Sequence, residues 1–277
     1  MQFLRYIPKS YLSWCLGSLA NIPLPQPIAG WLVGIFARAY KIDPSTATRE
    51  FKSFHSIGEF FTRDLKSELR PLGEGVLCPV DGTLRRAEDI RADGTVVQVK
   101  DKNYSISALL GGDGSAQRFL HGQCWNFYLS PQDAHHIHSP ISGAIVKTIH
   151  IPGKLWPVND WALFTIEGLF AVNERVVTLI ESEHGLIGVV MVGATNVGRI
   201  AVSYTDCETN TRPWKREHQR EIVHSPPIAI ERGAKIGTFK MGSSVVMLTE
   251  RKIHSLEGER GLLKVRYGQG TAELCSA

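Results

Sequence analysis

The stretch Lys240-Met241-Gly242-Ser243-Ser244-Val245-Val246 joins a turn pair to an apolar run. Gly-Ser is a common turn dipeptide, so Gly242-Ser243 indicates a bend. The β-branched residues that follow predict a strand over 244–248. On this reading the stretch is an ordinary turn that leads into a strand.

The same bend also places a hydroxyl beside a peptide carbonyl. Glycine has no Cβ and tolerates strained dihedrals, so Ser243 Oγ could reach the carbonyl carbon of Gly242 and shift the acyl group from nitrogen to oxygen. β-Elimination of that ester leaves dehydroalanine, which hydrolyses to a pyruvoyl group and ammonia. The residues alone leave both readings open.

Outward from this stretch, the chain after Pro71 alternates short β-branched runs with Gly, Asn and Asp turns. Such runs are typical of a mostly β body. The predicted strands are Thr95–Val99, Trp125–Leu129, Ala144–Ile149, Arg175–Ile180, Gly188–Val192, Arg199–Tyr204 and Ser244–Leu248. Before this body, Asp43-Pro44 predicts a helix start, and Ser56 to Glu59 a capping box for a helix through Leu65. The predicted class is α+β, a mostly β catalytic body preceded by N-terminal amphipathic helices.

The N-terminal segment 1–42 carries all of the net charge of +4. It contains Arg5, Lys9, Arg38 and Lys41 and no acid, while the other 27 basic and 27 acidic residues cancel. The charge is too small to predict nucleic-acid binding. A basic, aromatic-rich segment beside a neutral body predicts a surface for anionic lipid.

Within this segment, residues Ile28, Trp31, Leu32, Ile35 and Phe36 recur at helical spacing. Such a helix can lie in a membrane interface or pack on the protein's own body. The apolar run over 11–20 is too short to span a bilayer and stops before three prolines. A signal peptide is the rival reading, since basic residues precede that run.

The histidine block His135-His136-Ile137-His138 puts three imidazoles in four positions. In a strand, His136 and His138 share one face and His135 takes the other. His-x-His can ligate zinc, but no third ligand is evident nearby, so no metal is predicted. A histidine is the usual general base for a serine.

Such a base needs an acid to orient it. Asp81, in Cys78-Pro79-Val80-Asp81-Gly82, is one of many acids available, and Asp-Gly alone indicates only a turn. The five cysteines are odd in number and lack a Cys-x-x-Cys spacing, which favours a reducing compartment over a disulfide framework.

Together these motifs resemble the bacterial, pyruvoyl-dependent phosphatidylserine decarboxylase family. The resemblance runs over nearly the whole chain, in blocks that follow the family's order. The blocks are 59–65 with Arg70-Pro71, 79–82, 103–111, 128–138, 173–177, 192–195 and 237–244. The chain departs from the family's pattern at Met241 and Ser244 in the processing block, and at Ala134 and His136 in the histidine block.

Position by position, the resemblance implies that Asp81 is the charge-relay acid, His138 the base and Ser243 the pyruvoyl precursor. His135 matches a second histidine that the family links to decarboxylation. Cleavage between Gly242 and Ser243 would give a beta chain, 1–242, and an alpha chain, 243–277. The two chains would pair as a heterodimer, and two such heterodimers could associate as a homodimer. The implied domains are a membrane-surface segment, 1–42, and a catalytic domain, 43–277.

The implied reaction converts phosphatidylserine to phosphatidylethanolamine and CO₂, on the cytoplasmic side of the cell membrane, with the enzyme bound peripherally to an anionic surface. Three alternatives stay open at this point. They are a pyruvoyl-dependent decarboxylase of a soluble amino acid, an uncleaved Ser-His-Asp hydrolase and a non-catalytic lipid-binding protein. Ser243 lacks the Gly-x-Ser-x-Gly elbow, which counts against the hydrolase.

Overall fold

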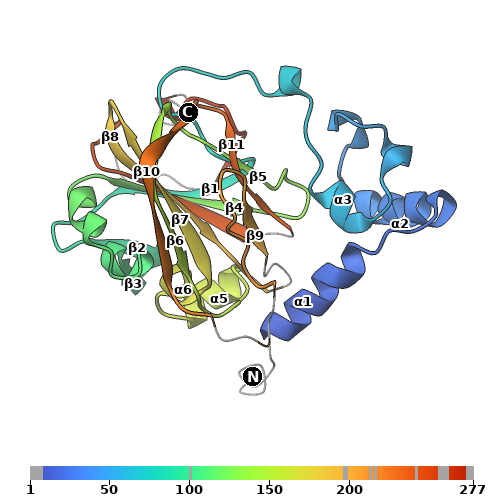
Figure 1. The fold of residues 1–277 in the computed structure, drawn as a ribbon, viewed down its shortest axis with the longest axis horizontal. Helices are drawn as coiled ribbons and strands as arrows, with labels where there is room; N and C mark the ends of the chain where they lie inside the picture. Colours follow the sequence, from blue (N-terminus) through green and yellow to red (C-terminus); the bar gives the residue numbers. More distant parts are fainter. Residues whose placement is uncertain are drawn as a thin grey trace.

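The structure is a computed structural model of the 277-residue chain. It describes residues 9–99, 102–195, 199–211, 214, 217–240, 243–254 and 262–272. Figure 1 places a group of N-terminal helices at one side of a β body.

The helices are α1 (Lys9–Ala20), α2 (Gln26–Ala39), α3 (Ile57–Phe61), α4 (Ile106–Leu109), α5 (Asp160–Thr165) and α6 (Leu169–Val172), with 3₁₀ turns at Pro44–Thr46, Phe51–Ser53, Ser67–Leu69 and Gly114–Phe119. The strands are β1 (Gly82–Asp89), β2 (Thr95–Val99), β3 (Lys102–Ser105), β4 (Gln123–Leu129), β5 (His136–His138), β6 (Gly143–Ile151), β7 (Arg175–Ser182), β8 (Gly185–Val192), β9 (Ile200–Val202), β10 (Arg220–Ile230), β11 (Lys235–Phe239), β12 (Ser243–Thr249) and β13 (Leu263–Val265). The predicted α+β class is confirmed.

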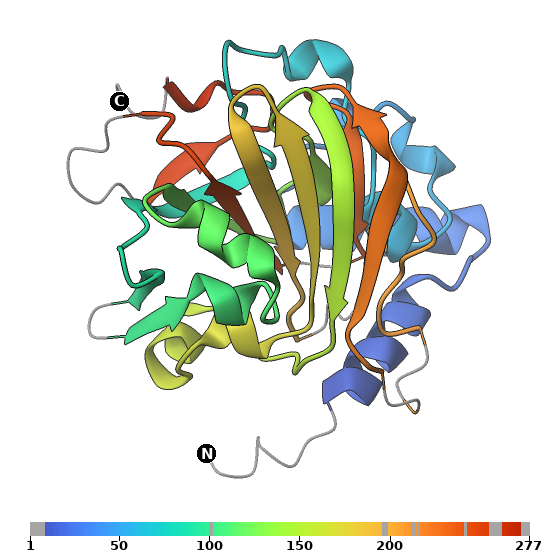
Figure 2. The same cartoon turned by 60° about the vertical axis from the view of Figure 1, so that its left-hand side comes forward.

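A large antiparallel sheet forms the body. Among the described residues it has eight strands, in the order β10-β6-β7-β8-β12-β4-β1-β13. Figure 2 shows β8, β7, β6 and β10 side by side. The described chain also forms a three-stranded sheet, β5-β11-β9, and a two-stranded one, β2-β3.

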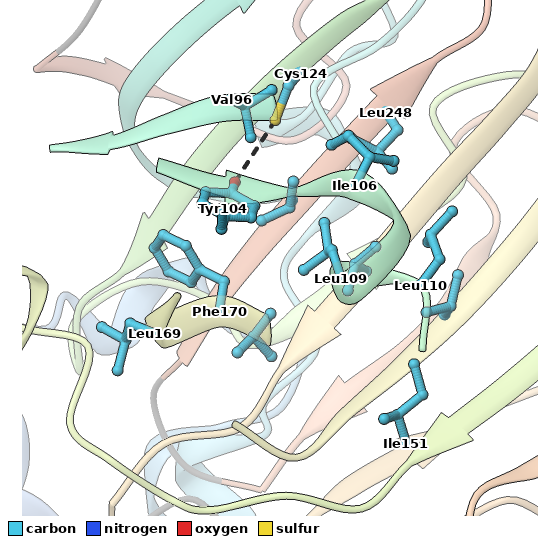
Figure 3. Close-up of a cluster of buried hydrophobic side chains, with 14 of the residues drawn as sticks. Val96, Tyr104, Ile106, Leu109, Leu110, Cys124, Ile151, Leu169, Phe170 and Leu248 are labelled. Carbon is cyan, nitrogen blue, oxygen red and sulfur yellow. Dashed lines mark hydrogen bonds between the residues drawn. The ribbon is translucent and has the colours of Figure 1, made fainter. Parts of the chain in front are cut away.

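The large sheet is covered on both faces. One core cluster joins it to the β5-β11-β9 sheet, through Ile137, Ile236 and Phe239. The other joins it to β2, β3 and the short helices, through side chains such as Tyr104 and Phe170 (Figure 3). Since both faces are buried, β8 has no polar–apolar alternation and every one of its residues is buried.

Strand β12 lies in the middle of this sheet, between β8 and β4. Its side chains alternate between the two cores, Val245 and Met247 on one side and Val246 and Leu248 on the other. A strand that pairs on both edges and packs on both faces is held firmly in place.

The N-terminal helices share a third core cluster that contains Val33, Ala37, Phe54 and Phe60. This cluster includes residues on both sides of position 42, and the division into 1–42 and 43–277 stays a prediction. Among the described helices, none is both long and apolar enough to cross a bilayer.

Two predicted helix starts are confirmed. Asp43 accepts a hydrogen bond from Ser45 N at 2.9 Å, and Ser56 Oγ accepts one from Glu59 N at 3.0 Å. The predicted end of the second helix at Leu65 is wrong, because α3 ends at Phe61. Leu65 instead forms an antiparallel bridge with Ala47, which requires extended backbone.

Candidate active site

The histidine block lies at an edge between two segments that fix its backbone. Strand β5 pairs with β11, and Phe239 N donates a hydrogen bond of 2.9 Å to His135 O. On the other side, His138 N donates to Pro79 O at 2.9 Å. Because Ile137 faces the core, the alternation of a strand directs His136 and His138 to the opposite side, as predicted.

His135 is fully buried, and its ring lies 4.0 Å from that of Phe61. Its Nδ1 is 2.8 Å from the carbonyl oxygen of Asp133, so Nδ1 carries the proton and Nε2 has a free lone pair. Nε2 is buried and has no hydrogen-bond partner among the described residues. Burial lowers the pKa of His135 to about 3, and the imidazole is therefore neutral at pH 7.

His136 is held by polar side chains. Its Nδ1 is 2.9 Å from Thr238 Oγ1, and its Nε2 is 3.1 Å from Asp64 Oδ1. Burial lowers its pKa to about 4, and the nearby charge of Lys235 acts in the same direction. Asp64 accepts a hydrogen bond from Lys235 at 3.0 Å, whereas His136 Nε2, although close to Asp64, makes no hydrogen bond among the described residues.

His138 stacks on Tyr267, with ring centroids 3.8 Å apart and planes inclined by 12°. Its Nδ1 is buried and has no hydrogen-bond partner in the described part of the chain. Burial, and then the neighbouring His136, lower the pKa of His138 to about 4, while the charge of Asp81 opposes the shift. A neutral imidazole with an unpaired nitrogen can accept a proton.

Asp81 is buried and has three donors. Arg70 donates to both carboxylate oxygens, from Nε to Oδ1 at 2.9 Å and from Nη2 to Oδ2 at 2.5 Å. Tyr267 N donates to Oδ1 at 2.9 Å. Among the described residues, no hydrogen bond joins Asp81 to His138. The two are linked through Tyr267, whose backbone binds the acid and whose ring covers the base.

Strand β4 connects the acid to the predicted cleavage site. Ser243 pairs with Leu129 of β4 on one edge, and Thr83 of β1 pairs with Tyr128 on the other. Gly82 sits so close to β4 that a Cβ there would lie 2.4 Å from Tyr128 O, which explains the glycine after Asp81. With strands about 4.8 Å apart, Asp81 and Ser243 are two strand spacings from one another at the same end of β4.

The structure thus brings Asp81, His135 and His138 into one region, and β4 and β11 connect this region to the backbone of Ser243. Gly242 lies outside the described residues, and only the backbone of Ser243 is described. The roles assigned to these residues stay predictions.

Three side chains at this site were not assigned a role from the sequence: Arg63, Arg70 and Tyr267. Arg63 is buried, donates from Nη2 to Gln132 O at 3.1 Å and has its pKa lowered by burial. The two arginines fall within the block that carries the family resemblance, which was a usable signal. Nothing near Tyr267 in the sequence points to the site, because only folding brings it to Asp81.

A cavity of about 730 Å³ opens beside Asp81. Five charged side chains line this cavity. Three are basic, Arg70, Lys264 and Arg266, and two are acidic, Asp81 and Asp133. Tyr267 is part of the same wall. Asp81 and the tyrosine that stacks on His138 therefore border a space that can admit a small polar group.

Residues 57–273 match a family model described as phosphatidylserine decarboxylase. The chain belongs to the phosphatidylserine decarboxylase family. The match covers every residue of the site just described and includes the Gly242-Ser243 pair. Membership makes the protein an enzyme, a carbon–carbon lyase, which excludes the hydrolase and the non-catalytic alternatives.

Curated relatives of the decarboxylase family agree over most of their length. The phosphatidylserine decarboxylase proenzyme of Myxococcus xanthus is 36% identical over 255 residues, 91% of this chain and 89% of the relative. The proenzyme of Anaeromyxobacter sp. (strain K) is 40% identical over 253 residues, 89% and 88% of the two chains. That of Coxiella burnetii is 38% identical over 249 residues, 88% and 86%. All three relatives carry the name proenzyme, which describes a protein made as a precursor.

Proposed function

We propose that this chain converts phosphatidylserine to phosphatidylethanolamine and CO₂, using a pyruvoyl group made from Ser243 when the chain cuts itself after Gly242. The hydrogen bond from Phe239 N to His135 O carries the proposal, because it ties the strand that leads into the cleavage site to the buried histidines. Membership of the decarboxylase family supports the reaction, and the proenzyme name of the relatives supports the cleavage.

In the maturation step, His138 accepts the proton of the Ser243 hydroxyl as that oxygen attacks the Gly242 carbonyl. Its lowered pKa, about 4, keeps the ring neutral at pH 7 with a lone pair free for the proton, although burial also makes the ring a weaker base. Asp81 favours the protonated ring by its charge, and it fixes Tyr267, on which the ring stacks. Tyr267 and Arg70 are positioning residues in this proposal.

The residues present fit a pyruvoyl group at position 243. That position begins a central strand, and the strand before it, β11, is hydrogen-bonded to His135, a buried histidine whose Nε2 has no partner among the described residues. Once formed, the group supplies a carbonyl that withdraws electrons from the carbon that loses CO₂. We assign to His135 Nε2 the handling of the proton at that carbon, and to the buried surroundings the exclusion of water.

After cleavage the alpha chain, 243–277, would stay bound to the beta chain, 1–242. Strand β12 begins at the new end and is paired with β4 on one side and β8 on the other. Four of its side chains, Val245 to Leu248, are completely buried. Two ladders of hydrogen bonds and two core faces support a stable heterodimer, and association of two such pairs stays a prediction.

The substrate keeps its acyl chains in a membrane, so the enzyme must work at that surface. Helix α2 turns Ala29, Val33 and Ala37 inward and leaves Trp31 62% exposed. The basic charge of residues 1–42 also favours binding to an anionic membrane surface. We propose peripheral binding to the cytoplasmic face of the cell membrane.

Intact mass of the purified protein tests the cleavage. We expect two chains, with pyruvoyl blocking the N-terminus of the fragment that starts at 243. A single chain of 30.7 kDa after prolonged incubation would refute it. CO₂ release from phosphatidylserine in mixed micelles, against free serine as the control substrate, tests the reaction. Release from serine at an equal or higher rate would favour the soluble amino-acid alternative.

Variants of the four proposed residues separate the two steps. Ser243→Ala should abolish both cleavage and decarboxylation. Asp81→Asn and His138→Ala should block maturation, since loss of the acid or the base costs on the order of 10⁴ in related serine chemistry. His135→Ala should mature substantially and release little CO₂. A His135→Ala enzyme with wild-type activity would remove this residue from the reaction.

A further inference from the structure

A second group of ionisable side chains lies away from the proposed active site. It consists of His150 in β6, Glu174 just before β7 and Glu217 just before β10. Among the described residues, this is the one group in which at least three donor atoms of His, Cys, Asp or Glu lie within 4.8 Å of one another. The decarboxylation chemistry uses none of the three.

The charges in this group do not balance. His150 is 1% exposed and Glu174 is 7% exposed. Even a protonated His150 supplies one positive charge to two carboxylates. Arg220 lies on the wall of the cavity beside this group, but among the described residues no ion pair joins it to either carboxylate. Two carboxylates that share one imidazole, one of them buried, favour an added cation.

The hydrogen bonds do not balance either. His150 Nε2 is 3.1 Å from Glu174 Oε1 and 3.4 Å from Glu217 Oε2. One nitrogen has one proton and can serve one of these oxygens well. The 3.1 Å contact is a hydrogen bond, while Glu217 Oε2 is buried and has no hydrogen-bond partner among the described residues.

The spacing suits a small divalent cation instead. Tetrahedral zinc binds His nitrogen and carboxylate oxygen at about 2.0–2.2 Å, which separates ligand atoms by about 3.3–3.6 Å. The distances of 3.1 and 3.4 Å around His150 Nε2 need only slight adjustment to reach these values. A divalent ion with neutral His150 and two carboxylates also brings the net charge of the group to zero.

The group is accessible from one side. Glu217 is part of the wall of a cavity of about 690 Å³, together with Cys207, Glu208 and His218. An ion could enter by this route, and water could complete its coordination. The site also joins three neighbouring strands, since β6 pairs with both β7 and β10.

We propose that His150, Glu174 and Glu217 form a binding site for a first-row divalent cation of the zinc type, which fastens the segment before β10 to the large sheet. The sequence predicted no metal, because that prediction rested on the histidine block alone, which lacked a third close ligand; His150, Glu174 and Glu217 come together only in the fold.

Zinc binding to the full chain tests this site without reference to catalysis. The Ser243→Ala chain, freed of metal with a chelator, would be titrated with Zn²⁺ by calorimetry and equilibrium dialysis. We expect one ion per chain and a rise in Tm of about 5–10 °C at a hundredfold excess over Kd. Absence of binding at micromolar Zn²⁺ would overturn the proposal, whatever the outcome of the decarboxylase assays.

Variants locate the ion. Glu217→Gln keeps the side-chain shape and should weaken Zn²⁺ binding by at least about 100-fold, as should His150→Asn. His184→Asn is the matched control, because its imidazole is exposed and lies 3.7 Å from Glu183. Equal stoichiometry and affinity in Glu217→Gln and His184→Asn would place the ion elsewhere and refute the assignment. Glu217 is partly exposed, so Glu217→Gln should still fold. The test therefore remains valid even if His150→Asn fails to fold.

Discussion

The ring of Tyr267 lies 3.8 Å from that of His138 and nearly parallel to it, and the backbone N–H of the same tyrosine donates to Asp81 at 2.9 Å. One residue from the C-terminal part of the chain therefore contacts both the proposed acid and the proposed base. This arrangement differs from a relay in which the acid binds the imidazole directly. Here Asp81 acts on His138 through its charge and through the placement of Tyr267.

Replacing Tyr267 by leucine should slow maturation, because it removes the flat surface that holds the His138 ring. Tyr267→Phe keeps that surface and the backbone donor, so it should mature at close to the wild-type rate. The fraction of cleaved chain on a denaturing gel over time measures both. If Tyr267→Leu and Tyr267→Phe matured equally fast, the stacking would have no role in positioning His138.

Arg70 should contribute to stability and to maturation in separable ways. The Arg70–Asp81 pair is largely buried, with side chains 12% and 8% exposed, and the ion pair raises the pKa of Arg70. Arg70→Gln leaves the buried carboxylate short of a cation, which typically costs about 3–5 kcal/mol. The double variant Arg70→Gln, Asp81→Asn should recover much of that loss.

Urea unfolding of these variants in the Ser243→Ala background measures the free energy of unfolding without interference from cleavage. In the cleavable background the double variant should remain unprocessed, since it lacks the acid. Rapid maturation of the double variant would show that Asp81 is needed only to balance Arg70.

Acid should destabilise the protein through its buried histidines. In the folded state the pKa is about 3 for His135 and about 4 for His136 and His138, against an ordinary 6.5. The unfolded chain takes up these protons near pH 6.5, and the folded chain does so only near pH 4 or below. The stability is therefore complete above pH 6.5 and is lost as the pH falls towards 4.

Between about pH 7.5 and 5, each of these histidines should cost on the order of 1–2 kcal/mol of unfolding free energy, with the total reduced by their coupling. Urea titrations of the Ser243→Ala chain at several pH values measure the slope. His136→Asn should flatten it, whereas His184→Asn, an exposed control, should not. A slope unchanged by His136→Asn would mean that this ring is not buried in its neutral form.

Much of the fold could be predicted because a run of β-branched residues indicates a strand from local sequence alone. All seven predicted strands are confirmed, to within a few residues at each end. Strand β10 was missed because Pro226 and Pro227 interrupt it, and it pairs with β6 through an irregular register between Val223 and Ile228. Strands β1, β3, β5, β11 and β13 were not predicted either, and two of these, β5 and β13, have only three residues each.

The site was predictable only in part. The positions of Asp81, His135 and His138 followed from motifs that each lie within a few residues. Arg70 lies in a block that resembles the family, but its contact with Asp81, 11 positions away, was not predicted. Tyr267 contacts Asp81 across 186 positions, and no local pattern signals it. The lowered pKa values arise from burial, which depends on the packing of Phe61 and Tyr267 over the rings.

The predicted membrane stripe of α2 divides into two faces in the structure. Ile28, Trp31 and Ile35 are 52%, 62% and 41% exposed, whereas Phe36 packs against Tyr40 and Phe61. Each fully inserted apolar side chain contributes about 1.5–3 kcal/mol, and this contribution does not depend on salt. Each basic residue adds about 1 kcal/mol near an anionic surface, and salt screens it within about 8–10 Å.

Trp31→Ser with Ile35→Ser should therefore remove the binding to anionic liposomes that persists in high salt. Arg38→Gln with Lys41→Gln should reduce only the salt-sensitive part. Phe36→Ser is the matched control. It should lower the stability of the protein, because the ring packs against the helical cluster. It should leave the ratio of salt-sensitive to salt-insensitive liposome binding unchanged. Liposome flotation at low and high salt measures both terms. If the Trp31, Ile35 variant floated as well as the wild type at high salt, the exposed face of α2 would not be the surface that meets the membrane.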